Sequence, residues 1–159
     1  MLDAPAKAIK RKLRNQGAEK IISFFDGGSV GDVRWNVSRI NIQKDYQFWF
    51  EKVLEEPWLG LIIKSKRPNS QYLTEIVNKA NASNRCYIVK ESFHSLPWYY
   101  SEISDMVVAL TVNTLPTALL ECLINNKKTR GVFFDYPNLM KQETDIYSWG
   151  KDKVVFRSI

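Results

Sequence analysis

The sequence has few cysteines, one histidine and no long hydrophobic run. Cys86 and Cys122 lie in separate apolar segments without a CxxC pattern or a neighbouring histidine. These features argue against a disulfide framework and a zinc site, and we expect two reduced thiols in the core rather than a disulfide. No apolar segment approaches the roughly 20 residues that span a bilayer, and no secretory signal is visible. We therefore expect a cytoplasmic protein.

The composition is that of one globular domain with a basic surface. Of 159 residues, 45% are hydrophobic and 13% are aromatic, which is sufficient for one well-filled core. The net charge of +6 favours an anionic partner, which could be a phosphate, a nucleic acid or an acidic membrane surface. Charge alone does not choose among these three partners.

Residues 1–19 form a basic N-terminal segment, which we interpret as a helix or a linker preceding a domain at 20–159. Its cations surround two apolar residues, Ile9 and Leu13; they are Lys7, Lys10, Arg11, Lys12 and Arg14. One interpretation is a solvated leader. The other is a helix attracted peripherally to an anionic membrane.

The remainder of the chain alternates apolar strands with helical segments. Strands are predicted at 20–25, 58–64, 85–90, 105–110 and 130–136, and 153–156 is a candidate sixth. Helices are predicted at 41–56, 70–82 and 116–126, and 98–104 is a brief helix or a turn. Strands that are apolar throughout are buried on both faces, as in a parallel sheet covered by helices. We predict an α/β fold with a doubly wound, mainly parallel Rossmann-like sheet, and we expect the chain to be part of a longer protein.

In an open parallel sheet, ligands bind at the loops that follow the carboxyl ends of the strands. Those loops are expected near residues 26–33, 64–70, 90–98 and 111–116. Pro116 suits the first turn of a helix, so Asn113 or Thr114 is expected to cap that helix. Its N-terminus, with Thr111, Asn113 and Thr114, could bind a phosphate or diphosphate. The alternative is that these polar residues only cap the helix.

Two kinds of charged residue could complete such a site. Glu121 lies on the otherwise apolar helix that follows Pro116, where its carboxylate could accept hydrogen bonds from ribose hydroxyls. Lys64 and Lys66 follow a strand directly and could neutralise a diphosphate. The simpler interpretation of all three is that they are solvated surface residues.

Three further candidates have weaker signals. Gly28 and Ser29 belong to "GGSVG", which could let a ligand approach the backbone but matches neither GxGxxG nor a P-loop. His94 is the only histidine, and a lone histidine more often packs or hydrogen-bonds than catalyses. No catalytic triad, paired carboxylates or metal cluster is recognisable, so the catalytic residues stay unassigned.

The segment "SDMVVALTVNTLPTALLECLINNKKTRGVFFDY" resembles the C-terminal, nucleotide-sugar-binding half of GT-B fold glycosyltransferases. The shared parts are Ser104-Asp105 at the start of a strand, the turn 111–114, Leu120-Glu121-Cys122 in a helix, and the strand 132–135. The resemblance extends over about residues 20–157, with "ISFFDGG", "LGLIIKSKRP" and "YIVKESFH" upstream. It is most specific at 104–136.

The resemblance implies that Thr114 and the adjacent backbone hold the donor diphosphate and that Glu121 holds the ribose. It also implies that Lys64 or Lys66 binds the phosphates and that the loop at His94 binds the base or sugar. Asn113 stands where retaining members commonly have a first glutamate, which favours an inverting enzyme. The family's Gly-x-Pro after the helix is absent as well. GT-B enzymes use a second domain for the acceptor, so we expect transfer to need another domain or a partner chain.

The leading hypothesis is therefore a domain that binds a nucleotide-diphosphate sugar for synthesis of a glycan or surface polysaccharide, without a metal or other cofactor. The alternatives are a glycerophosphotransferase-like domain and a non-catalytic Rossmann-like binding or regulatory module. A nucleic acid is a less favoured partner, because Trp and Tyr fall mainly in predicted helices rather than on a stacking platform.

Overall fold

The fold is a parallel α/β sheet covered by helices on both faces. The computed structural model describes residues 4–25, 39–64, 75, 78, 81–89, 97–111, 117–125, 130–135 and 155–157. The strands are β1 (Lys20–Phe25), β2 (Leu59–Lys64), β3 (Cys86–Ile88), β4 (Met106–Thr111), β5 (Arg130–Asp135) and β6 (Val155–Arg157). The helices are α1 (Ala4–Asn15), α2 (Arg39–Glu55), α4 (Pro97–Ile103) and α5 (Thr117–Asn125).

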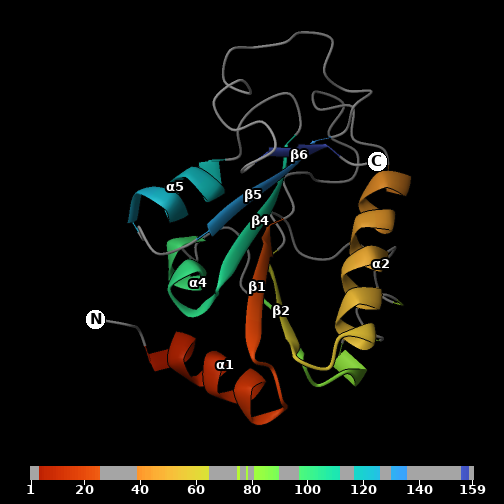
Figure 1. The fold of residues 1–159 in the computed structure, drawn as a ribbon, viewed down its shortest axis with the longest axis vertical. Coiled ribbons are helices and arrows are strands. Elements are labelled where there is room, and N and C mark those ends of the chain that lie inside the picture. Colours follow the sequence, from red (N-terminus) through yellow and green to blue (C-terminus); the bar gives the residue numbers. More distant parts are fainter. Residues whose placement is uncertain are drawn as a thin grey trace, which may run out of the picture.

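The six strands lie in the order β3-β2-β1-β4-β5-β6, and every neighbouring pair is parallel (Figure 1). This is the strand order of a doubly wound Rossmann fold. The chain moves outward from β1 to β3 and then returns to place β4 on the other side of β1. The direction of winding therefore reverses between β1 and β4, with Phe25 opposite Ala109 at the carboxyl end of their pairing.

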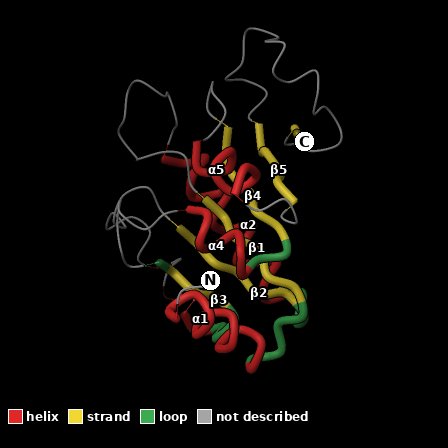
Figure 2. The backbone as a smooth tube through the Cα atoms, turned by 90° about the vertical axis from the view of Figure 1, so that its left-hand side faces the viewer, coloured by secondary structure: helices red, strands yellow, loops and turns green. Residues whose placement is uncertain are grey.

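Helix α2 covers one face of the sheet, whereas α1, α4 and α5 cover the other (Figures 1 and 2). On the α2 face, Phe24 packs against Tyr46 and Trp49, with 5.7 Å between ring centroids in each pair. On the opposite face, Ile21, Ile62 and Val107 are fully buried under the other three helices. Both faces of the central strands are thus shielded from solvent by helices, which explains why these strands are apolar throughout.

The basic N-terminal segment is a helix that packs on the sheet. Ala6 and Leu13 of α1 are buried. The turn after the helix contains Gly17, whose φ of +94° is in the left-handed region that favours glycine. A Cβ atom added at Gly60 of β2 would lie 2.8 Å from the Ala18 Cβ. The chain after α1 therefore passes very close to β2, and only glycine fits at position 60.

The doubly wound parallel α/β fold is confirmed, and the predicted strands coincide with the observed ones to within a few residues at each end. Both cysteines are buried free thiols, as expected. Of the predicted helix 70–82, the structure describes Glu75, Asn78, Asn81 and Ala82, all of them helical. Among the described helices, none has the length and apolar character needed to cross a membrane.

Candidate functional site at the carboxyl edge of the sheet

The fold directs attention to the edge where β1 and β4 end. Parallel strands present all their carboxyl ends at one edge, and a ligand crevice opens there where the winding direction reverses. In this chain β1 ends at Phe25 and β4 at Thr111. Two described elements carry predicted site residues to the same edge, namely the end of β2 and helix α5.

Lys64 is the last residue of β2 and lies on the sheet face that α5 covers. Side chains alternate between faces along a strand, and Ile62, two residues earlier, packs in the same cluster as Leu119 of α5. Lys64 is half-buried, whereas the five residues before it are buried. Lys64 is therefore the point at which β2 leaves the buried core, at the edge of the sheet where the ligand crevice is predicted.

Helix α5 follows β4 and begins at Thr117 among the described residues. Leu119 and Cys122 are fully buried beneath it, and Gly131 of β5 lets the helix approach closely. A Cβ atom at position 131 would lie 2.9 Å from the Leu123 Cδ2. Thr117 is exposed and Glu121 is half-buried. Among the described residues, no hydrogen-bond or ion-pair partner approaches the Glu121 carboxylate.

The electrostatics of Cys122 connect these two elements. The pKa of the Cys122 thiol is raised to about 12, mainly by burial. A hydrogen bond with the Ser101 side chain and the charge of Lys64 lower this pKa, whereas the charge of Glu121 raises it. Lys64 and Glu121, predicted separately from the sequence, are therefore both within electrostatic reach of one buried atom. The thiol itself is protonated at neutral pH and is unsuited to act as a nucleophile.

Asp45 is a titratable group that the sequence analysis did not single out. It lies in the second turn of α2, and desolvation raises its pKa from 3.8 to about 7. The segment "QKDYQF" reads as ordinary amphipathic helix, because burial of this carboxyl depends on the packing of α2 rather than on local sequence. A carboxyl group that titrates near neutral pH is a candidate proton acceptor or donor.

The other predicted site residues are not placed by the structure. Gly28, Ser29, Lys66, His94, Asn113 and Thr114 lie outside the described residues. The backbone of Thr111 ends β4 at the expected edge, but its side chain is not described. The assignments of these seven residues stay predictions. The structure describes the remaining two, Lys64 and Glu121, and both charges act on the buried Cys122 thiol.

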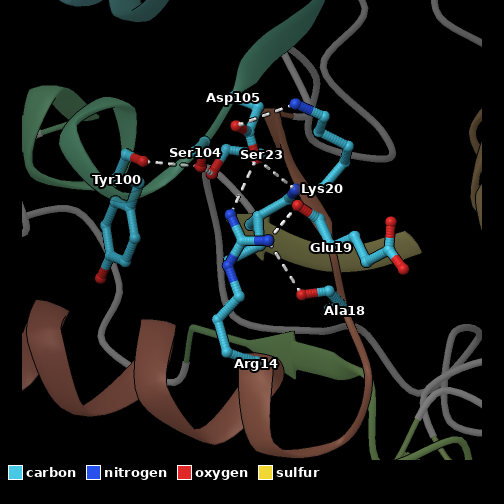
Figure 3. Close-up of polar contacts among 9 residues, drawn as sticks. Arg14, Ala18, Glu19, Lys20, Ser23, Tyr100, Ser104 and Asp105 are labelled. Atoms are coloured by element: carbon cyan, nitrogen blue, oxygen red, sulfur yellow. Dashed lines mark hydrogen bonds and ion pairs between the residues drawn. The ribbon is translucent and has the colours of Figure 1, made fainter. Parts of the chain in front are cut away.

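A polar cluster occupies the opposite edge of the sheet (Figure 3). Asp105 accepts a hydrogen bond from the backbone N–H of Ile21 at 2.8 Å and lies 3.4 Å from an Arg14 guanidinium nitrogen and 3.9 Å from the Lys20 ammonium. The Ser104 hydroxyl donates to the Tyr100 carbonyl at 2.7 Å, with its oxygen 2.5 Å from the Ser23 hydroxyl oxygen. Ser104-Asp105 thus joins β1, α1 and α4 at the amino edge, away from the candidate site.

The described part of the site offers one cation, one carboxylate and the first turns of a helix. Among the described residues, no cluster of three or more His, Cys, Asp and Glu could hold a metal ion. Lys64 and α5 together suit an anion bound beside a hydroxyl-bearing group. The chain matches no protein-family model, and no curated protein is significantly similar to it in sequence.

Proposed function

We propose that the chain is a nucleotide-diphosphate-sugar binding domain of a glycosyltransferase with a GT-B-like architecture. The observation that carries the proposal is the position of Lys64 on the sheet face where α5 packs, at the carboxyl edge where the direction of winding reverses between β1 and β4. A doubly wound sheet binds nucleotides at this edge. The resemblance of residues 104–136 to nucleotide-sugar-binding domains is consistent with the same edge.

The roles of the residues follow from the chemistry of a nucleoside diphosphate. Its diphosphate carries negative charge, which the Lys64 ammonium and the backbone N–H groups at the start of α5 can offset. Its ribose presents two hydroxyls, to which the Glu121 carboxylate can offer acceptors. Because Glu121 lies one turn beyond Thr117, both ligand parts can be contacted from a single helix.

In the complete enzyme, an acceptor hydroxyl would attack the anomeric carbon with inversion, and the nucleoside diphosphate would leave. Lys64 and the α5 N–H groups stabilise the charge that develops on this leaving group, so the proposed reaction does not require a metal. The acceptor and its general base belong to a second domain or chain. The product of this activity is a glycan such as a surface polysaccharide.

A thermal-shift and calorimetric screen against UDP, GDP, CDP and TDP tests the proposal. One of them should stabilise the chain by about 2.7 kcal/mol at a concentration one hundred times its Kd. Lys64→Ala, Glu121→Ala and Thr114→Ala should each weaken this effect, whereas Lys52→Ala, on α2 at the opposite face, should not. If no diphosphate binds, or if Lys52→Ala weakens binding as much as Lys64→Ala, the proposal is wrong. A CDP preference would favour the glycerophosphotransferase-like alternative.

A further inference from the structure

The positive charge of the chain is concentrated in one helix. Helix α1 contains five of the 23 Lys and Arg and no Asp or Glu, so the rest of the chain holds 18 cations and 17 acids. A segment of 12 residues therefore accounts for five of the six net positive charges. Charge this localised creates a strong potential on one surface rather than a weak potential over the whole molecule.

The packing of α1 separates its cations into two groups. Arg14 turns toward the domain, where its guanidinium donates hydrogen bonds to the carbonyls of Ala18 and Glu19 and pairs with Asp105. Four others lie around the part of the helix that is not packed on the domain, which we call the basic face of α1: Lys7, Arg11 and Lys12 are exposed, and Lys10 is half-buried. The apolar side of the helix packs on the domain, where Ala6 and Leu13 are buried.

The basic face lies at the end of the molecule opposite the candidate nucleotide site. Figures 1 and 2 place α1 beside the amino ends of the strands, whereas β1 and β4 end at the far edge. A partner bound to α1 would therefore leave the carboxyl edge open to substrate. The function of this surface is independent of the proposed nucleotide binding.

We infer that the basic face of α1 docks the protein on a bilayer that contains anionic lipids. Three of its four cations are lysines, which act as point charges without the fixed bidentate geometry of arginine. Such charges suit mobile lipid headgroups better than the regularly spaced phosphates of a nucleic acid. Among the described side chains of α1, the large apolar ones, Ile9 and Leu13, pack on the core, so the contact is electrostatic and reversible, without insertion into the acyl region.

Co-sedimentation with lipid vesicles tests this inference. The wild-type chain should bind vesicles of phosphatidylcholine containing about one third phosphatidylserine, should not bind pure phosphatidylcholine, and should be released by salt. Each cation near an anionic surface contributes about five-fold to partitioning, so Lys7→Gln/Arg11→Gln/Lys12→Gln should reduce it on the order of a hundredfold. These three side chains are exposed, so the melting temperature should change little.

The matched control neutralises three cations elsewhere. Arg39→Gln/Lys44→Gln/Lys52→Gln lowers the net charge equally, and all three residues belong to α2, which covers the other face of the sheet. This variant should retain most of the binding. Equal weakening by the two triple variants, absence of binding to the anionic vesicles, or tighter binding to a duplex oligonucleotide than to vesicles would each overturn the inference.

Discussion

The backbone of Ile21 is bound twice by Asp105. The Ile21 N–H donates to the Asp105 carboxylate at 2.8 Å, and the Asp105 N–H donates to the Ile21 carbonyl, also at 2.8 Å. This pair of hydrogen bonds fastens β1 to the start of β4 at the amino edge. The two strands between which the winding direction reverses are thereby held in register at the end opposite the candidate site.

Replacing Asp105 should destabilise the fold more when the new side chain has no oxygen to accept the hydrogen bond from the Ile21 N–H. Asp105→Ala removes the acceptor of the Ile21 N–H and should cost about 1–3 kcal/mol. Asp105→Asn retains a carbonyl oxygen and loses only the half-exposed contacts with Arg14 and Lys20, which should cost less than about 1 kcal/mol. Urea denaturation of both variants measures the difference. An equal loss in both would mean that the ion pairs, not the backbone hydrogen bond, carry the stability.

Gly60→Ala should destabilise the protein by about 1–3 kcal/mol, because the added methyl would overlap the Ala18 methyl at 2.8 Å. Thermal or urea unfolding gives the cost. The double variant Gly60→Ala/Ala18→Gly removes the overlap and should recover part of the loss. If the double variant is no more stable than Gly60→Ala alone, the close approach of these two positions is not the cause.

Asp45 should make stability depend on pH. Its folded-state pKa, about 7, is raised above the ordinary value of 3.8, so the folded state binds its proton more tightly than the unfolded state does. The stability from this group is complete below about pH 4 and is lost as pH rises through about 7. Asp45→Asn mimics the protonated form and should stabilise the protein at pH 8 by on the order of 1–3 kcal/mol.

The comparison for this prediction is Glu51→Gln, which neutralises an exposed carboxylate on the same helix. Urea titrations at pH 5 and pH 8 should show that the free energy of unfolding changes less with pH in Asp45→Asn than in Glu51→Gln. If the wild type and Asp45→Asn lose stability equally between these pH values, Asp45 is not the group responsible.

The fold could be predicted because its signals are local. "KIISFF" and "LGLIIK" are apolar at nearly every position, and this pattern requires helices on both sides of a sheet. The strand order was not predicted, since it depends on pairing between segments distant in the chain. For the same reason, the sequence does not predict the hydrogen bond between Arg14 and Asp105, which are 91 residues apart, or the burial of Asp45.

The candidate site was predicted less completely than the fold. Lys64 could be assigned to the carboxyl edge because it ends a recognisable strand, and Glu121 because it interrupts an apolar helix. Their common electrostatic effect on Cys122 was not foreseen, because it depends on the packing of α5 against the sheet, which joins segments distant in the chain. The residues of the intervening loops are known only by their sequence pattern.

The most direct test is to map nucleoside diphosphate binding on the backbone amides by NMR. Titration with the diphosphate that stabilises the chain should shift the amide signals of Lys64, Thr111, Thr117 and Glu121. The signals of Lys7, Arg11 and Lys12 on α1 should stay in place. Shifts confined to α1 would instead show an anion held by the basic helix alone and would contradict a nucleotide site at the carboxyl edge.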